Sequence, residues 1–292
     1  MKRQLSLAFA IALIGIAPAS AATKLPVVMT PLAPTLSTNF SGGDQIAGLL
    51  TSGSNIFLIG TVETTTSPLL TASPLGGSDG FITALTSQGA HTWDLRLGGA
   101  GDDVATAGYV DAIGNIWITG ASTLAATATP SGLNRLTIWE VSPTGLLLNT
   151  STRDFTDVNI PTSITLKGSN FIIQGISSKS GFPTFALSLT PLGKIGSATA
   201  RTTLPPPTAQ SFSATSSAYG WLSYVATKAV KGASGIRSGT NVLLKSSLKD
   251  KSIKAAYSVQ GAPIAMQFQS GIGVALLTQG SGTYFLTILH TK

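Results

Sequence analysis

The sequence has no cysteine, only two histidines and only 11 acidic residues among its 292. The absence of cysteine excludes disulfides, thiolate metal sites and a cysteine nucleophile. With so few histidines, aspartates and glutamates, most hydrolytic and metal-dependent chemistries lack their usual residues. Charged residues make up 10% of the chain and hydrophobic residues 43%, so the composition is that of a protein with a sizeable core and not of a disordered chain.

The first 21 residues have the features of a secretory signal peptide. Basic residues at 2–3 precede an apolar run at 5–17, which is too short to span a bilayer as a helix, and small residues at 18–21 form a cleavage site. A buried core helix is the alternative. The segment predicts an exported protein, secreted or associated with the cell surface, whose mature chain forms one domain over residues 22–292. No later stretch is long and apolar enough to predict a transmembrane helix.

An internal repeat of 50–60 residues follows. A short apolar run that closes on Gly, or once on Ala, occurs five times and ends at positions 60, 120, 175, 226 and 280. A second apolar run recurs between these and begins at positions 80, 136, 184, 241 and 283. The runs are rich in Ile, Val, Phe, Trp and Thr and are bounded by Gly, Asn, Ser and Pro, a pattern that predicts β-strands.

One repeat unit can be written out as four strands, at 105–111, 115–119, 136–141 and 146–153. The residues between such strands, for example 111–115, have the Gly-containing pattern of hairpin turns. Four strands per repeat is the pattern of a propeller blade, and near-continuous apolar runs fit strands that neighbouring blades cover on both faces. The predicted fold class is therefore all-β, a β-propeller of five four-stranded blades.

Residues 77–122 carry a more specific pattern. The segment Asp79-Gly-Phe81 is followed by Gly89, Trp93, Leu97-Gly-Gly-Ala-Gly-Asp-Asp103, Val110-Asp111 and Gly114-Asn-Ile-Trp-Ile-Thr-Gly120. This pattern resembles the bacterial β-propeller repeat called SBBP. The match fades through the other units and is weakest over 207–254, where the terminal Gly and the Asp-Gly-Phe start are missing. The resemblance implies a propeller in an exported or cell-surface setting and no single activity.

The two ends of the chain are predicted to share one blade. The first unit starts with strands at 46–60, whereas the last unit stops after its third strand at 283–289. The strand-like stretch at 27–40 is expected to supply the missing fourth strand, which would hide two sheet edges. A closed ring is the resulting prediction, and an open array with a capping strand is the alternative. The prolines within 202–208 predict an extended crossing between two blades.

Isolated motifs for catalysis or metal binding have simpler interpretations. Residues 76–80 match G-x-S-x-G, but a strand follows where a nucleophile elbow requires a helix. His91 and His290 have no recognisable partner in the sequence and are expected to be solvated or structural. Asp102 and Asp103 lack the alternating carboxylates that Ca²⁺ requires, so we expect them to accept backbone N–H groups at the turn into a strand.

Paired carboxylates define the alternative function. Some five-bladed propellers are glycosidases, and such enzymes use two carboxylates about 5–10 Å apart in a concave site. Several acids of this chain lie at repeat-equivalent turns, where a structural role suffices, and no predicted inner strand carries an acid that would face a channel. A glycan-active hydrolase with carboxylates at the mouth of the propeller channel is therefore the alternative, and no catalytic residue is assigned. No cofactor, metal site or nucleic-acid partner is expected.

Charge is distributed unevenly along the chain. Residues 190–292 contain ten basic residues and one acid, whereas 22–189 contain six basic residues and ten acids. Lys228, Lys231 and Arg237 share one predicted loop between the second and third strands of a blade, and they form the candidate site for an anionic ligand. Three further lysines, at 249, 251 and 254, fall on the opposite hairpin. A solvated basic surface is the alternative.

The sequence thus predicts an exported, non-catalytic propeller that acts as a binding or scaffolding module. Its expected partners are an anionic polysaccharide, an envelope polymer or a surface protein.

Overall fold

The computed structural model describes residues 25–40, 44–63, 69–123, 132–181, 183–201 and 211–290, and every regular element within them is a β-strand. The predicted signal peptide and the proline stretch at 202–208 lie outside the described residues. Among the residues described, no helix is long and apolar enough to cross a membrane.

Five sheets follow the predicted repeat, and we call them blades 1 to 5 in chain order. Blade 1 consists of β4 (Gln45–Ser52), β5 (Asn55–Val62), β6 (Asp79–Thr86) and β7 (His91–Leu97). Blade 2 consists of β8 (Asp103–Val110), β9 (Ile116–Ser122), β10 (Arg135–Val141) and β11 (Leu147–Asp154). Blade 3 consists of β12 (Asn159–Lys167), β13 (Asn170–Ser177), β14 (Thr184–Leu189) and β15 (Thr199–Arg201).

The last two blades include strands from the N-terminal segment. Blade 4 consists of β16 (Ser211–Thr215), β17 (Tyr219–Val225), β19 (Asn241–Ser247), β20 (Ile253–Ser258) and β2 (Thr30–Pro31). Blade 5 consists of β21 (Ala262–Gln269), β22 (Gly273–Gly280), β23 (Thr283–Leu289) and β3 (Leu36–Asn39). A separate two-stranded pairing joins β1 (Val27–Val28) to β18 (Ala233–Ser234). The two recurring apolar runs of the sequence are the second and third main strands of every blade, as predicted.

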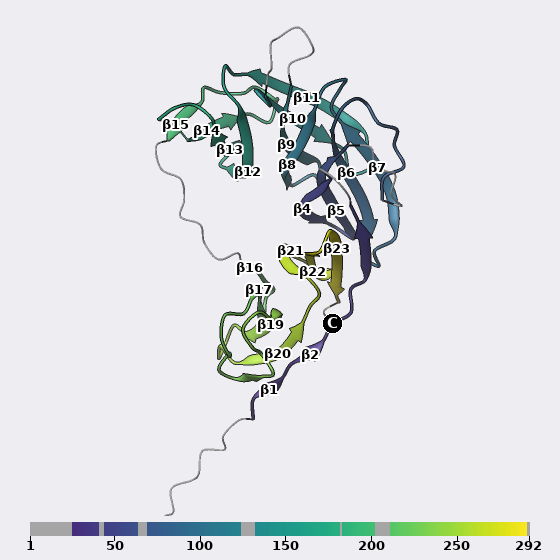
Figure 1. Ribbon diagram of the computed structural model, residues 1–292, viewed down its shortest axis with the longest axis vertical. Coiled ribbons are helices and arrows are strands. Elements are labelled where there is room, and N and C mark those ends of the chain that lie inside the picture. The colour runs from purple at the N-terminus through teal and green to yellow at the C-terminus, as the bar shows by residue number, and fades with distance from the viewer. Residues whose placement is uncertain are drawn as a thin grey trace, which may run out of the picture.

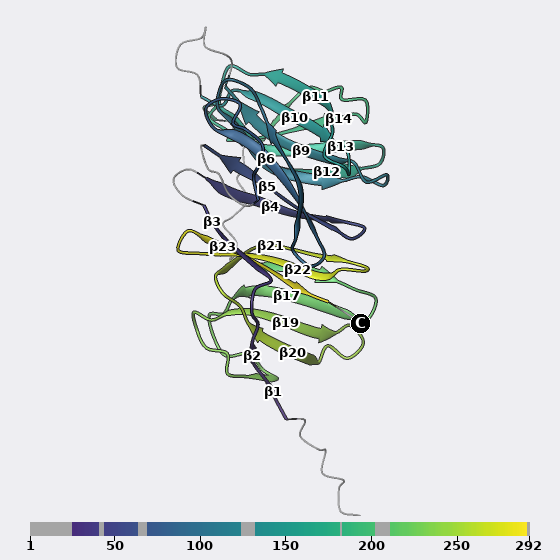
Figure 2. The same cartoon turned by 90° about the vertical axis from the view of Figure 1, so that its right-hand side faces the viewer.

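The first strand of each blade is its inner strand. β12 packs against β8, β8 against β4, β4 against β21, and β21 against β16. The blades therefore follow one another along an arc in the order 3, 2, 1, 5, 4 (Figure 1), and a side view shows their strands in successive layers (Figure 2). The protein is a β-propeller whose core consists of the apolar layers between adjacent blades.

Glycine is required near the end of the second strand in blades 1, 2 and 3. Gly60, Gly120 and Gly175 each pair with a residue next to a β-bulge in the inner strand. A Cβ atom on Gly120 would lie 1.9 Å from the carbonyl oxygen of Val104, and the corresponding carbonyls lie 2.0 and 2.3 Å from the Cβ positions of the other two. The repeat keeps glycine here because the bulged inner strand comes too close for any side chain.

Blade 5 differs at this place. Thr278, and not Gly280, pairs with Pro263 beside the bulge of the inner strand β21. Gly280 pairs with Thr283 at the tight turn between β22 and β23. The expected alignment of Gly280 with the other terminal glycines is therefore two residues out, because the glycine that closes this apolar run belongs to the turn and not to the bulge.

The N-terminal segment completes blade 5, as predicted. β3 pairs antiparallel with β23, and the Ile288 amide adds a hydrogen bond of 2.9 Å to the Thr35 hydroxyl. The same segment also runs along blade 4, where β2 pairs in parallel with β20 and β1 with β18. One stretch of chain therefore ties blade 4 to blade 5 and covers the outer edges of both sheets.

The arc is open between blades 3 and 4 (Figure 1). Among the described strands, those of blade 3 do not pack against those of blade 4 as neighbouring blades do elsewhere. The burial of the second strands of blades 2 and 3 also indicates an open side. β9 is buried throughout, whereas alternate residues of β13 are partly exposed and Ile176 is 46% exposed. The corresponding face of blade 4 is covered by loop 226–240 and by Val27 and Met29. The structure matches the open array with a capping strand and not the closed ring, because this loop occupies the face that blade 3 would need.

Candidate functional site

Positive charge is concentrated on blade 4. Between residues 211 and 259 there are seven basic residues and one acid: Lys228, Lys231, Arg237, Lys245, Lys249, Lys251, Lys254 and Asp250. Strands β21, β22 and β23 of the neighbouring blade 5 contain no charged residue. The charge asymmetry of the sequence therefore belongs to one blade at one end of the arc.

The three predicted binding residues, Lys228, Lys231 and Arg237, are all exposed on the loop between β17 and β19. This loop folds back along the sheet, and its Val230 and Ile236 pack into the core of blade 4. As a result Lys231 lines a cavity of about 180 Å³ together with Lys251, which comes from the turn between β19 and β20. The prediction that these two lysines lie apart is wrong, because the fold-back brings them to one place. Lys228 and Arg237 do not line this cavity.

One carboxylate lies within this basic surface. Asp250 accepts hydrogen bonds from the backbone amide and the hydroxyl of Ser252, at 3.1 and 2.7 Å, and it pairs with Lys254 at 3.5 Å. The hydrogen bonds from Ser252 hold the pKa of Asp250 well below its ordinary value. Within the described part of the chain, no carboxylate lies at ion-pair distance from the three predicted binding residues. Their charges are therefore available to an anionic ligand.

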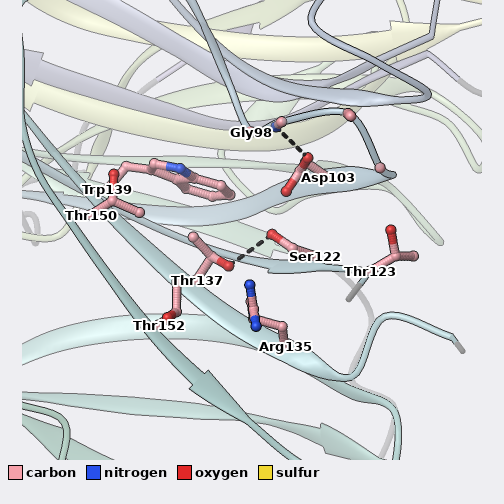
Figure 3. A pocket seen from close by; sticks show the side chains of 12 residues that line it. Gly98, Asp103, Ser122, Thr123, Arg135, Thr137, Trp139, Thr150 and Thr152 are labelled. Atoms are coloured by element: carbon pink, nitrogen blue, oxygen red, sulfur yellow. Dashed lines mark hydrogen bonds between the residues drawn. The ribbon is translucent and has the colours of Figure 1, made fainter. Parts of the chain in front are cut away.

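A second concave site lies between blades 1 and 2. It has a volume of about 230 Å³, and Figure 3 shows the side chains that line it. The lining residues are Gly98, Gly99, Ala100, Gly101, Asp103, Ser122, Thr123, Arg135, Thr137, Trp139, Thr150 and Thr152. Asp103 is the one carboxylate of this lining, so the cavity does not contain the acid pair that glycoside hydrolysis requires.

Asp103 is buried at the start of β8. Its Oδ2 accepts a hydrogen bond of 2.8 Å from the Gly99 amide, and Asp102 accepts one of 3.0 Å from the Ser78 amide. These contacts confirm the expectation that both aspartates bind backbone N–H groups. Burial raises the pKa of Asp103, and the nearby charges of Asp79 and Asp102 raise it further, against the opposing hydrogen bonds from Ser122 and Gly99.

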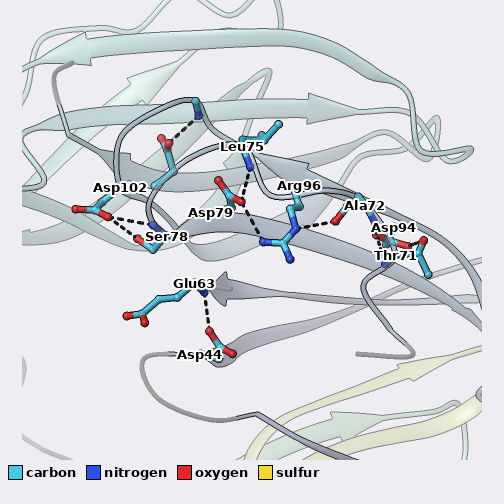
Figure 4. A network of polar contacts seen from close by, with 12 residues as sticks. Asp44, Glu63, Thr71, Ala72, Leu75, Ser78, Asp79, Asp94, Arg96 and Asp102 are labelled. Atoms are coloured by element: carbon cyan, nitrogen blue, oxygen red, sulfur yellow. Dashed lines mark hydrogen bonds and ion pairs between the residues drawn. The ribbon is translucent and has the colours of Figure 1, made fainter. Parts of the chain in front are cut away.

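The acids of blade 1 form a separate polar network (Figure 4). Asp79 forms an ion pair of 3.0 Å with Arg96, and both side chains are buried. Asp94 accepts hydrogen bonds from the backbone and the hydroxyl of Thr71, and Asp44 accepts one from the backbone of blade 1. No group of three or more potential metal ligands occurs among the residues that the structure describes. These carboxylates therefore tie loops to strands.

The histidines and the G-x-S-x-G motif have structural roles. The expectation that His91 lacks a partner is wrong, because its Nε2 lies 3.0 Å from Asp94 Oδ1 three residues along β7. His290 Nδ1 lies 3.0 Å from the carbonyl oxygen of Ile272. Ser78 directly precedes strand β6 and no helix follows, so the motif is not a nucleophile elbow.

Comparisons with known proteins place the chain in no family. No family model matches the sequence, and no curated protein matches it. Among solved structures, the chain is similar to the WD40 domain of Neurospora crassa Pan2, with 10% identity, coverage of 91% of this chain and 98% of that chain, and a TM-score of 0.33. It is also similar to the β-propeller domain of Myceliophteria thermophila Cps50 (Swd1), with 10% identity, coverage of 83% and 98%, and a TM-score of 0.34. A glucose dehydrogenase matches with 10% identity, coverage of 92% and 88%, and a TM-score of 0.32.

Proposed function

We propose that this β-propeller is a binding module that recognises an anionic polymer through the basic surface of blade 4. The observation that carries the proposal is that Lys231 and Lys251, from loops at opposite ends of the blade, line one cavity. Lysine ammonium groups on flexible stems suit a ligand with repeated negative charges, since they act as point charges without demanding one geometry. The further exposed cations Lys228 and Arg237 extend the surface beyond the cavity.

We also propose that the protein is exported and that its ligand belongs to the cell envelope or the extracellular space. The support is the signal-peptide pattern of residues 1–21 and the resemblance of 77–122 to SBBP repeats. Mass spectrometry of the protein recovered from culture medium and envelope fractions tests this. The expected result is a mature N-terminus at Ala22, and an intact Met1 in the cytosolic fraction would contradict it.

The binding proposal is tested with alginate, a polyuronate, and with dextran as an uncharged polysaccharide. We expect the full-length mature protein to bind immobilised alginate and not dextran, with affinity that falls as salt screens the charges. The double variant Lys231→Gln/Lys251→Gln should bind about tenfold more weakly, as expected for the loss of two exposed ionic contacts.

The matched control removes the same charge from blade 3. Lys167→Gln/Lys194→Gln changes two exposed lysines far along the arc and should leave alginate binding within twofold of the wild type. Equal weakening by both double variants would mean that only the net charge matters, and the site on blade 4 would be abandoned. Binding to dextran that is insensitive to salt would also overturn the proposal.

A further inference from the structure

One position distinguishes blade 2 from its neighbours. In the third strand, the residue that pairs with the end of the second strand is Phe81 in blade 1, Phe185 in blade 3 and Phe285 in blade 5. In blade 2 the same position is Thr137, which pairs with Gly120. The sequence alignment of the second apolar run already shows this exchange of phenylalanine for threonine.

The phenylalanine rings fill the space that this position faces. The Phe81 ring comes within 2.7 Å of the place where a Cβ on Gly60 would lie, and it stacks on Phe40 with ring centroids 5.9 Å apart. The Phe185 ring likewise covers Gly175 at 2.5 Å. Thr137 is much smaller, and the cavity of about 230 Å³ lies against it. In blade 2 the ring of Trp139, two residues further along the same strand, covers Gly120 at 2.6 Å instead. The cavity lies beside this ring, where Thr137 carries no ring of its own.

The cavity is built from buried polar groups. Asp103, Ser122 and Thr137 are each more than nine-tenths buried, and the hydroxyls of Ser122 and Thr137 lie 2.8 Å apart (Figure 3). Thr123, Thr150 and Thr152 add three further hydroxyls. Hydroxyl groups both donate and accept hydrogen bonds, so a cavity lined by five of them favours a ligand that does the same.

Charge at the cavity selects against anions. Asp103 faces it, and Asp79 and Asp102 are close enough to raise the pKa of Asp103. Arg135, the one cation of the lining, already forms an ion pair of 2.6 Å with Asp154. Trp139 contributes an apolar wall beside these groups (Figure 3).

We propose that the cavity between blades 1 and 2 is a binding site for a neutral polyhydroxyl unit, a single sugar ring or a polyol. The hydroxyls of Ser122 and Thr137 exchange hydrogen bonds with ligand hydroxyls, and Asp103 accepts from them. Trp139 packs on the apolar face of the ring. The site is separate from the basic surface on blade 4, which lies beyond blades 1 and 5 at one end of the arc.

The test is saturation-transfer NMR with the folded mature protein and a panel of D-galactose, D-mannose, N-acetyl-D-glucosamine and myo-inositol at millimolar concentration. We expect at least one of the four to receive saturation from the wild type. Thr137→Val keeps the volume and removes one hydroxyl, so it should weaken that binding about tenfold. Thr137→Phe introduces the residue found in blades 1, 3 and 5, places a ring in the cavity and should abolish binding while the protein stays folded.

Thr119→Val is the control, because Thr119 is buried in β9 of the same blade and does not line the cavity. It should leave binding unchanged. Thermal unfolding of each variant separates loss of binding from loss of fold. Saturation transfer that survives Thr137→Phe, or the absence of transfer to all four probes, overturns the proposal.

Discussion

Arg96 Nη1 lies 3.0 Å from Asp79 Oδ2 on the adjacent strands β6 and β7, and both side chains are almost completely buried. We expect Arg96→Met to lower the free energy of unfolding by about 3–5 kcal/mol, because it leaves the Asp79 charge buried without its partner. The double variant Arg96→Met/Asp79→Leu should recover much of this loss. Urea denaturation measures both.

The exposed pair Arg135–Asp154 is the matched comparison, with side chains 33% and 53% exposed. Arg135→Met should cost no more than about 1 kcal/mol, because solvent screens an exposed ion pair. If the two arginine variants lost equal stability, burial would not be what sets the strength of the Asp79–Arg96 pair.

The glycine of the repeat gives a second prediction. Gly120→Ala should destabilise blade 2 by about 3 kcal/mol or more, since the new Cβ would overlap the Val104 carbonyl oxygen and the backbone must move. Gly99→Ala, where nothing lies within 4 Å of a Cβ, should change stability by less than about 0.5 kcal/mol. Thermal unfolding of the two variants checks this, and similar melting temperatures would contradict the close approach.

The pKa of Asp103 predicts how stability changes with pH. Burial raises this pKa, so the folded state favours the protonated carboxyl, and the stabilisation that protonation brings is lost as pH rises through the folded pKa. Asp103→Asn should therefore be more stable than the wild type at neutral pH and lose that advantage below about pH 4. Asparagine fits this place, since Asn159 occupies it at the start of β12 in blade 3.

For Asp94 we expect the opposite change of stability with pH, because its pKa is lowered. Although burial acts to raise its pKa, the hydrogen bonds from Thr71 and Ala72 bring it below the ordinary value. Asp94→Asn should destabilise the protein at neutral pH, and the difference should shrink as pH falls through the lowered pKa. The test is to measure the unfolding free energies of the Asp103 and Asp94 variants from about pH 8 down to about pH 3, below the ordinary pKa of aspartate. If both substitutions stabilised the protein at neutral pH, or both destabilised it, the opposite pKa shifts of Asp103 and Asp94 would be refuted.

The open arc is tested on strand β13. Ile173 is fully buried against blade 2, whereas Ile176 is 46% exposed on the face that blade 4 would cover in a closed ring. Ile173→Lys should unfold the protein or cost more than about 4 kcal/mol, and Ile176→Lys should cost less than about 1 kcal/mol. Comparable destabilisation by both substitutions would mean that the ring is closed in solution.

Much of the fold could be read from the chain because each blade is built from local patterns. Apolar strands separated by Gly-containing turns recur every 50–60 residues, and the glycine at 60, 120 and 175 marks the place where a bulged strand crosses close by. The missing strand of the last unit and the strand-like stretch before residue 40 together predicted β3. Such features depend on neighbours in sequence or on the count of strands, so the sequence determined them.

The tertiary structure alone decided how these pieces meet. Loop 226–240 contains no regular pattern, yet it folds back over blade 4, places Lys231 beside Lys251 and covers the face that blade 3 would need. The sequence shows threonine at position 137 where blades 1 and 3 have phenylalanine. Only the packing shows that the Trp139 ring covers Gly120 in its place and that a cavity lies beside it. Packing between elements far apart in the chain sets both outcomes, and a repeat pattern carries no information about such contacts.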